Sequence, residues 1–314
     1  MSELLSLRDV HVLFNTAAGT VRAVNGVSLD LAVGETLGLV GESGCGKSTL
    51  GKAIMRLVPV AAGEVRVDGV DIAHLDRRAL TDVRRKVQMI FQDPYGSLNP
   101  RSTVGRSVSQ PLVIAGWEEK AIRERVDTLL GWVGLPADSK HRFPHEFSGG
   151  QRQRIGIARA LALSPKLIIC DEPVSALDVS VRAQVINLLE DLKSQFGVSY
   201  LFISHDLSVV EHIADRVAVM YLGTIVEAGR RDQIWRTPQH HYTKALLEAA
   251  PIANPKAARA RKRTVLQGEL PSALAPPAGC PFHSRCPIAV ERCKTDKPEL
   301  RTVGNSARAA CHLV

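Results

Sequence analysis

The first forty residues alternate between apolar and polar positions in short runs. Alternation through residues 4–14 and 21–31, with a turn at 17–20 between them, is typical of half-buried β-strands. The continuous apolar run at 36–40 predicts a buried strand. The chain is therefore expected to begin with antiparallel β-structure.

Short-range signals then predict one helix and one hairpin. Residues 48–57 are expected to form the helix, and residues 63–72 a second pair of strands. The dipeptide Asp68-Gly69 lies inside that pair and favours a tight hairpin turn.

Helical spacing and buried-strand runs alternate further along the chain. Residues 118–133 and 151–163 have helical spacing, whereas 167–172 and 199–206 are short apolar runs of the kind buried in parallel sheets. No internal repeat occurs, so a single cassette is expected rather than a tandem pair. The order of elements predicts an α/β fold.

The amino-acid composition changes after Trp235. One short helix is expected within 237–251, and proline, alanine, lysine and arginine then dominate as far as Pro277. A boundary near residue 236 is expected, with one domain at 1–235 and an extension at 236–314.

The net charge of +8 is confined to that extension. Residues 1–235 contain 27 basic and 27 acidic residues, while 236–314 contain 13 and 5, with a basic run at 256–263. Such a run is typical of a solvated linker, with an anionic membrane face or RNA as alternatives. No apolar stretch reaches the ~18 residues of a membrane-spanning helix, and the N-terminus does not resemble a signal peptide, so a cytosolic protein is expected.

Residues 41–48 read Gly-Glu-Ser-Gly-Cys-Gly-Lys-Ser and match G-x-x-x-x-G-K-[ST] between a predicted strand and a predicted helix. Glycines let backbone N–H groups converge on phosphates at a helix N-terminus, while Lys47 would reach the β and γ oxygens. The residues expected to contact a nucleotide are Gly41, Ser43, Gly44, Cys45, Gly46, Lys47, Ser48 and Thr49.

The run LIICDE delivers Asp171 and Glu172 to the carboxyl end of a strand, where ligand sites of α/β sheets lie. Asp171 suits the outer shell of Mg²⁺. Glu172 suits polarising an attacking water, because phosphoryl transfer depends on positioning and charge neutralisation.

Residues 147–154, Phe-Ser-Gly-Gly-Gln-Arg-Gln-Arg, closely resemble the signature motif of ABC ATPases. The other motifs of that family follow the family order, with Gln92 in FQDP, Asp178 ending Ser-Ala-Leu-Asp and His205 in ISHD. The resemblance covers residues 4–235. It implies the P-loop NTPase fold of ABC ATPases.

In this family the fold includes an antiparallel β subdomain and a helical subdomain, here at about 95–163, and two cassettes close head to tail over two ATP molecules. The resemblance gives Gln92 a role in sensing Mg²⁺ and the permease, Asp178 in connecting the two sites, and His205 in holding the γ-phosphate and the water. Phe14 is placed beneath the adenine. Mg²⁺ is assigned to Ser48, Gln92 and Asp171. The partner's γ-phosphate is assigned to a helix N-terminus formed by Ser148, Gly149, Gly150 and Gln151.

Several longer stretches resemble the ATPases of dipeptide and oligopeptide importers, among them FQDPYGSLNPR and HHYTKALLEAAP. This resemblance implies two transmembrane permeases, an extracytoplasmic peptide-binding protein and a second homologous ATPase forming a heterodimer, with the chain peripheral on the cytoplasmic face of the inner membrane. Nickel-chelate and glutathione importers remain alternatives. A soluble ABC protein acting on nucleic acid or ribosomes is disfavoured, because it would carry two cassettes or a long coiled coil, and no nucleic-acid partner is expected.

Four cysteines gather near the end of the chain: Cys280, Cys286, Cys293 and Cys311. The tight C-x₂₋₄-C pairs of a zinc knuckle are absent, whereas loosely spaced thiolates suit a [4Fe–4S] cluster, as similar tails of peptide-importer ATPases imply. A cluster is therefore expected in the Cys-rich segment at 280–311 of this small extension, with Zn²⁺ and free thiols as alternatives. A metal would supply folding free energy that about eighty proline-rich residues could not.

Overall fold

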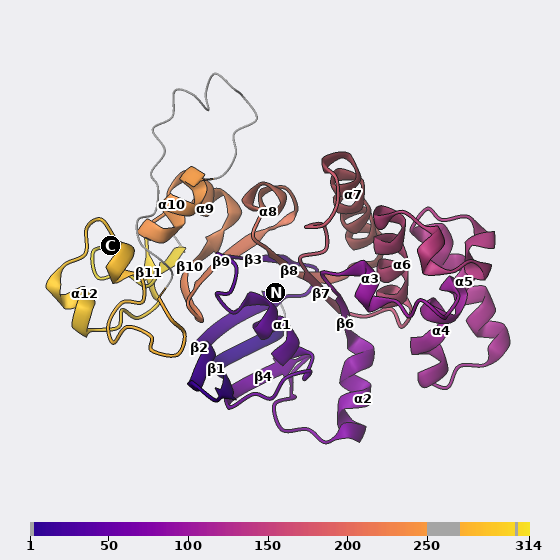
Figure 1. Cartoon of the computed structure of the whole chain (residues 1–314), viewed down its shortest axis with the longest axis horizontal. Coiled ribbons are helices and arrows are strands. Elements are labelled where there is room, and N and C mark those ends of the chain that lie inside the picture. The colour runs from indigo at the N-terminus through magenta and orange to yellow at the C-terminus, as the bar shows by residue number, and fades with distance from the viewer. Residues whose placement is uncertain (1–2, 250–270, 305–306) are drawn as a thin grey trace. The chain divides into compact units, whose positions relative to one another are not determined.

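The computed structural model describes residues 3–249, 271–304 and 307–314 (Figure 1). The basic run at 256–263 lies outside the described residues. The chain divides into two compact units. Unit 1 comprises Met1–Leu4, Ala32–Glu35 and His74–Ile203, and unit 2 comprises Leu5–Leu31, Thr36–Ala73 and Ser204–Val314.

Unit 1 contains parallel strands in the order β8-β7-β6: β6 (Val87–Ile90), β7 (Leu167–Asp171) and β8 (Ser199–Ser204), the last leaving the unit after Ile203. The register places Val87 beside Leu167 and Leu167 beside Ser199. Every residue of β7 and β8 is buried, as their apolar runs predict for a parallel sheet. Two helices accompany these strands, α2 (Arg77–Lys86) and α7 (Val179–Phe196).

The segment of unit 1 between β6 and β7 is helical, and its helices contact one another. The predicted helices at 118–133 and 151–163 are confirmed as α5 (Glu119–Trp132) and α6 (Gly149–Leu161). The other elements are α3 (Pro94–Ser97), α4 (Val104–Ile114) and the 3₁₀ turns η1 (Ala137–His141) and η2 (Pro144–Glu146).

Unit 2 contains the predicted antiparallel sheet, in the order β2-β1-β4-β5. Its strands are β1 (Glu3–Thr16), most of which belongs to this unit, β2 (Gly19–Ala32), β4 (Ala62–Val67) and β5 (Val70–Asp71). The hairpin predicted at Asp68-Gly69 is confirmed, because both residues have positive φ, 51° and 80°.

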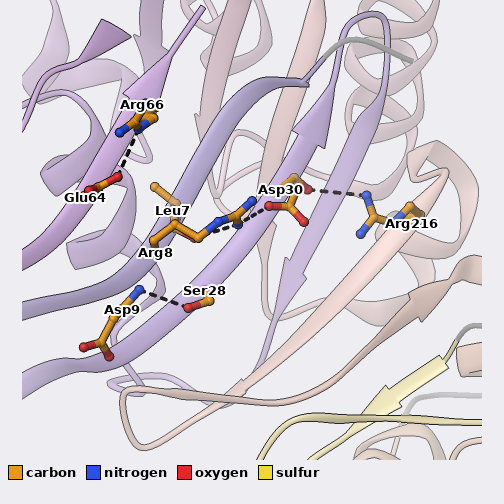
Figure 2. Close-up of polar contacts among 8 residues, drawn as sticks. All are labelled: Leu7, Arg8, Asp9, Ser28, Asp30, Glu64, Arg66 and Arg216. Carbon is orange, nitrogen blue, oxygen red and sulfur yellow. Dashed lines mark hydrogen bonds and ion pairs between the residues drawn. The ribbon is translucent and has the colours of Figure 1, made fainter. Parts of the chain in front are cut away.

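Polar contacts link residues of this sheet to one another and to Arg216 of the strand at Arg216–Tyr221 (Figure 2). Arg8 of β1 forms a cross-strand ion pair with Asp30 of β2. The Asp30 carbonyl accepts a hydrogen bond of 3.4 Å from Arg216 Nη1. Further contacts join Asp9 N–H to Ser28 Oγ at 3.0 Å and Arg66 to Glu64 at 3.0 Å. Exposed pairs of this kind each contribute only about 0–1 kcal/mol.

A second sheet of unit 2 has the order β11-β12-β10-β9-β3. β3 pairs in parallel with β9, and the remaining neighbours are antiparallel. Its strands are β3 (Thr36–Val40), β9 (Arg216–Tyr221), β10 (Thr224–Arg230), β11 (Arg301–Val303) and β12 (Ala307–Ala309). The end of the chain therefore adds strands to this sheet, which the sequence analysis did not predict.

The helices of unit 2 include α1, which follows β3 after the loop at 41–46. The prediction for 48–57 placed its end too late, because a turn follows Ile54. Unit 2 contains α1 (Lys47–Ile54), α8 (Leu207–Ile213), α9 (Arg231–Arg236), α10 (His241–Ala249), η3 (His283–Arg285) and α12 (Glu291–Thr295). Within the three described ranges, no helix combines the length and apolarity needed to cross a membrane.

Candidate nucleotide-binding site

The loop between β3 and α1 depends on glycine at two positions. Gly41 and Gly46 have φ of 155° and 106°, a backbone region that other residues rarely adopt. A Cβ at Gly41 would lie 2.2 Å from Met220 O, and one at Gly46 would lie 2.1 Å from Ala23 O. The neighbouring backbone therefore leaves no room for a side chain, which fixes the path of the loop.

Lys47, the first residue of α1, is 4% exposed. Its Nζ donates hydrogen bonds to Gly41 O at 2.8 Å and Glu42 O at 2.9 Å, and lies 3.7 Å from Cys45 Sγ. The ammonium is thus held inside the loop at the start of a helix, where backbone N–H groups favour anions. Burial raises the pKa of the Cys45 thiol, which therefore acts as a packing group.

Two residues from the C-terminal part of unit 2 contact this loop. The Glu42 N–H donates to the Tyr242 hydroxyl at 2.8 Å, and the Glu42 carboxylate accepts two hydrogen bonds from Arg285, at 2.7 and 3.1 Å. Sequence reasoning missed this contact. The stretch containing Tyr242 was noticed as a motif, but nothing in it indicates what the tyrosine touches.

In unit 1, Glu172 follows β7 with a φ of 46° and is 9% exposed. Its N–H donates to Ile203 O at 3.0 Å, which ties it to the end of β8. The Gln92 side-chain amide donates to Glu172 Oε2 at 2.9 Å. Two predicted catalytic residues, 80 positions apart in the sequence, are therefore in direct contact.

Asp171 ends β7 and is 4% exposed. The strand carries it and Glu172 to the carboxyl edge of the sheet, as its apolar run predicts. Burial raises the pKa of the preceding Cys170 thiol, so Cys170 is also a packing residue.

The signature segment begins α6 with a reciprocal cap. Ser148 Oγ accepts a hydrogen bond from Gln151 N–H at 3.3 Å, and Ser148 N–H donates to Gln151 Oε1 at 3.0 Å. Gly150 lies where a Cβ would be 2.3 Å from Val181 Cγ1, so α6 and α7 approach closely there. The predicted helix N-terminus is present, and its remaining N–H groups suit an anion.

The other predicted residues lie on elements expected to reach a nucleotide. Phe14 of β1 is 37% exposed, so its ring is accessible for stacking. Ser43 and Gly44 are exposed, and Ser48 and Thr49 are half-buried in the first turn of α1. Exposed Asp178 precedes α7, and exposed His205 directly follows β8.

The predicted residues thus form two groups. Unit 2 contributes Phe14, the loop at 41–49 and His205, while unit 1 contributes Gln92, the segment 148–151, Asp171, Glu172 and Asp178. The phosphate-binding loop lies wholly within unit 2, whereas Gln92 and the carboxylates of Asp171 and Glu172 lie within unit 1. The loop, the buried lysine and the carboxylates define a P-loop nucleotide hydrolase.

The four tail cysteines lie in one neighbourhood of unit 2. Burial, with a smaller contribution from the nearby thiols of Cys293, Cys311 and Cys286, raises the pKa of Cys280 to about 11. Cys280 N–H also donates to Cys293 O at 2.8 Å. However, in the described part of the chain no group of three or more His, Cys, Asp or Glu side chains is arranged to hold a metal ion. The thiols as placed therefore do not form a finished metal site.

Comparison with known proteins identifies the family of the chain. The family described as "ABC transporter" matches residues 24–175, and the family described as "Oligopeptide/dipeptide transporter, C-terminal region" matches residues 226–293. The oligopeptide transport ATP-binding protein AppF of Bacillus subtilis is 51% identical, over 99% of this chain and 97% of AppF. A Sinorhizobium fredii protein named "Probable peptide ABC transporter ATP-binding protein y4tS" is 53% identical, over 96% of this chain and 85% of its own.

Solved structures agree with this placement. The dimeric ATP-binding cassette MJ0796 bound to ADP and phosphate matches with a TM-score of 0.67 and 29% identity, over 73% of this chain and 99% of its own. CbiO1 of Clostridium perfringens, part of the ABC transporter complex cbiONQ, matches with a TM-score of 0.68 and 28% identity, over 76% and 92%. The chain belongs to the ATP-binding proteins of ABC transporters, in the group with an oligopeptide/dipeptide-transporter C-terminal region. The predictions of an ABC ATPase fold and a transport ATPase are confirmed.

Proposed function

We propose that the chain binds Mg-ATP and hydrolyses it to power the import of di- or oligopeptides through an ABC transporter. The observation that carries this proposal is the buried Glu172 held by Gln92 at the end of β7, in a chain with a complete phosphate-binding loop. The proposal extends the peptide-transport role in the relatives' names to this chain.

The loop at 41–49 would bind the phosphates. Its glycine-dependent path and the start of α1 present N–H groups, and the Lys47 ammonium exchanges its loop carbonyls for the β and γ oxygens. Phe14 would stack on the adenine. Ser48, Gln92 and Asp171 would hold Mg²⁺, which would neutralise phosphate charge.

Glu172 would orient and polarise the attacking water. Its carboxylate is fixed by the Gln92 amide and its backbone by Ile203, so little reorganisation is needed when the water arrives. His205 holds the γ-phosphate and the water at the end of β8. These roles need positioned polar groups and no covalent intermediate.

A second ATPase subunit would complete each site. The capped N-terminus of α6, with Ser148, Gly149, Gly150 and Gln151, would attract the γ-phosphate bound by the partner's loop, and Asp178 would connect the two sites. ATP binding then closes two cassettes head to tail. The partner is proposed to be a homologous chain, giving a heterodimer.

Unit 1 offers a surface for two transmembrane permease subunits. A hollow beside α4 is lined by Ser102, Arg106, Gln110, Val113, Ile114 and Arg159. Val113 and Ile114, which are 60% and 72% exposed, give this hollow an apolar edge that a permease subunit would cover. Docking there would hold the chain peripherally on the cytoplasmic face of the inner membrane.

Reconstitution tests this function. The chain would be purified with its two permeases and partner ATPase, placed in liposomes, and assayed with the extracytoplasmic peptide-binding protein. ATP turnover should rise when that protein carries a peptide; a rise only with nickel chelate or glutathione would reassign the substrate. Turnover that no loaded binding protein changes would refute the import role.

We also propose a domain division, with a nucleotide-binding domain at 1–235, including a helical subdomain at about 95–163, and a Cys-rich extension at 236–314. The separate family matches at 24–175 and 226–293 support this division. Cys280, Cys286, Cys293 and Cys311 would hold a [4Fe–4S] cluster, or alternatively Zn²⁺, after the thiols move closer together. An anaerobic absorption spectrum with metal analysis tests the cluster, and one equivalent of zinc without a visible band would refute it.

A further inference from the structure

The phosphate-binding loop contains an acidic residue, Glu42, directly after Gly41. A carboxylate in a loop that gathers positive groups for phosphates opposes binding, because like charges within a few ångströms repel. The structure pairs this carboxylate with Arg285 through two hydrogen bonds of 2.7 and 3.1 Å. Such a two-point contact is the strongest geometry available to arginine and carboxylate.

The arginine of this pair is buried and the glutamate is half-buried. The Arg285 side chain is 7% exposed and that of Glu42 is 29% exposed. The hydrogen bonds to Glu42 are the main cause that raises the pKa of Arg285, so the guanidinium stays charged. Surface ion pairs contribute little, but a buried pair strongly disfavours loss of one partner, which leaves a charge uncompensated.

Arg285 is held in place by its own neighbours. It ends the short turn η3 between Cys280 and Cys286, and the preceding Phe282 is 1% exposed. The Phe282 ring lies 5.4 Å from Tyr221 and 5.5 Å from Tyr242, in edge-on and tilted arrangements that aromatic pairs favour. This aromatic cluster anchors the cysteine-bearing turn beside the loop.

Tyr242 fixes the same loop residue from a second direction. Its hydroxyl accepts the Glu42 N–H at 2.8 Å, and the tyrosine itself is fully buried. The backbone and the side chain of Glu42 are thus both held by the C-terminal part of unit 2. Arg285 is 243 residues away from Glu42 in the sequence, yet it contacts the loop directly.

We propose that Arg285 is a positioning residue for nucleotide binding, which neutralises Glu42 and holds the phosphate-binding loop to the cysteine-bearing turn. This inference rests on the proposed function, since it concerns Mg-ATP at that loop. Loss of Arg285 leaves the Glu42 charge close to the phosphates. Loss of the Glu42 charge as well removes that repulsion.

A double-mutant cycle in the full-length chain tests the proposal. Dissociation constants for Mg-ATP would be measured by calorimetry in a Glu172→Gln background, which prevents turnover. Arg285→Ala should weaken affinity by about tenfold, the scale of a lost charged hydrogen bond. Adding Glu42→Gln should recover a large part of the lost affinity. Arg285→Lys keeps the charge but not the two-point contact, so its affinity should lie between those of the parent and Arg285→Ala.

Arg292→Ala is the matched control. Arg292 lies in the same C-terminal region, but its ion pair with Asp296 is exposed, with the two side chains 66% and 53% exposed. The Arg292→Ala chain should therefore bind Mg-ATP as tightly as the parent does. Unfolding midpoints would be recorded for every variant. If Arg285→Ala does not fold, the comparison of Arg285→Lys with and without Glu42→Gln carries the same test.

Unchanged affinity in Arg285→Ala, or a loss that Glu42→Gln does not reduce, would overturn the proposal, because a purely structural arginine would be indifferent to the charge at residue 42. A parent chain that binds no Mg-ATP would instead refute the proposed function, together with the inference that rests on it.

Discussion

Gly150, near the start of α6, offers a sharp test of the signature segment. A Cβ there would lie 2.3 Å from Val181 Cγ1 of α7, whereas apolar carbons normally stay about 3.5–4.0 Å apart. Val181 cannot turn away freely, because a β-branched side chain in a helix has one strongly preferred rotamer. In Gly150→Ala the N-terminus of α6 must therefore shift away from α7, and the capped segment at 148–151 shifts with it.

Overpacking of this kind costs about 1–3 kcal/mol in the free energy of unfolding. Gly156 is the matched control, because it lies in the same helix and no atom lies within 4 Å of a Cβ built on it. Gly156→Ala should instead stabilise the chain by about 0.5–1 kcal/mol, since glycine is a poor helix former. Urea unfolding followed by circular dichroism measures both changes.

Activity gives the second readout. Gly150→Ala should lower ATP turnover of the assembled transporter while the isolated chain keeps its affinity for nucleotide, because the phosphate-binding loop lies in the other unit. Val181→Ala removes the colliding methyl group and should recover stability and turnover together. A Gly150→Ala chain as stable and as active as Gly156→Ala would show that this close approach constrains nothing.

The remaining predictions concern single groups. Glu172→Gln should abolish steady ATP turnover while nucleotide binding persists, because only water activation is lost; unchanged turnover would remove Glu172 from its role. Lys47→Ala should weaken nucleotide binding itself, measured by calorimetry, and equal affinity would contradict the role of the buried ammonium. Burial lowers the pKa of His240 to about 4. The unfolded chain, in which this histidine has its ordinary pKa, then binds more protons than the folded chain between about pH 6.5 and 4. The free energy of unfolding should therefore decrease by on the order of 3 kcal/mol as the pH is lowered from about 6.5 to 4. Burial also raises the pKa of Glu227, which makes the folded chain take up a proton first and so favours folding as the pH is lowered. His240→Asn, which keeps an acceptor for the Tyr242 N–H, should therefore lose less stability than the parent on acidification, and equal losses would contradict this reasoning.

Elements that carry their own local signal could be predicted from the sequence. The antiparallel strands show alternation, the hairpin at Asp68-Gly69 has the residues its positive φ angles require, and the loop glycines at 41 and 46 lie where the backbone excludes a Cβ. Gln92 and Glu172 were each predicted as catalytic residues because both belong to motifs of one family, but their direct contact was not predicted. For the strands, the hairpin and the loop glycines, the constraint acts within a few residues, so it leaves a readable pattern.

Other features had no local signal. The long helix α7 was not predicted. Asp178 precedes it, but the Asp178 side chain makes no capping hydrogen bond to the first turn of the helix. β12 pairs with β10, where Ala309 lies beside Glu227. A three-residue strand has too few positions to show alternation, and a partner about eighty residues away leaves no periodicity to detect.

The phosphate-binding loop combines both kinds of information. Its backbone path follows from its own glycines and from the helix that begins at Lys47, which is why eight residues suffice to recognise it. The net charge around the loop does not follow from those residues, because the Glu42 carboxylate forms an ion pair with Arg285, which lies far away in the sequence. A chain with every nucleotide motif but without the C-terminal turn would therefore keep the geometry for phosphates and leave an unneutralised carboxylate beside them. If Arg285 positions the loop as proposed, the affinity of this loop for ATP is a property of unit 2 as a whole, including the turn that lies between its cysteines.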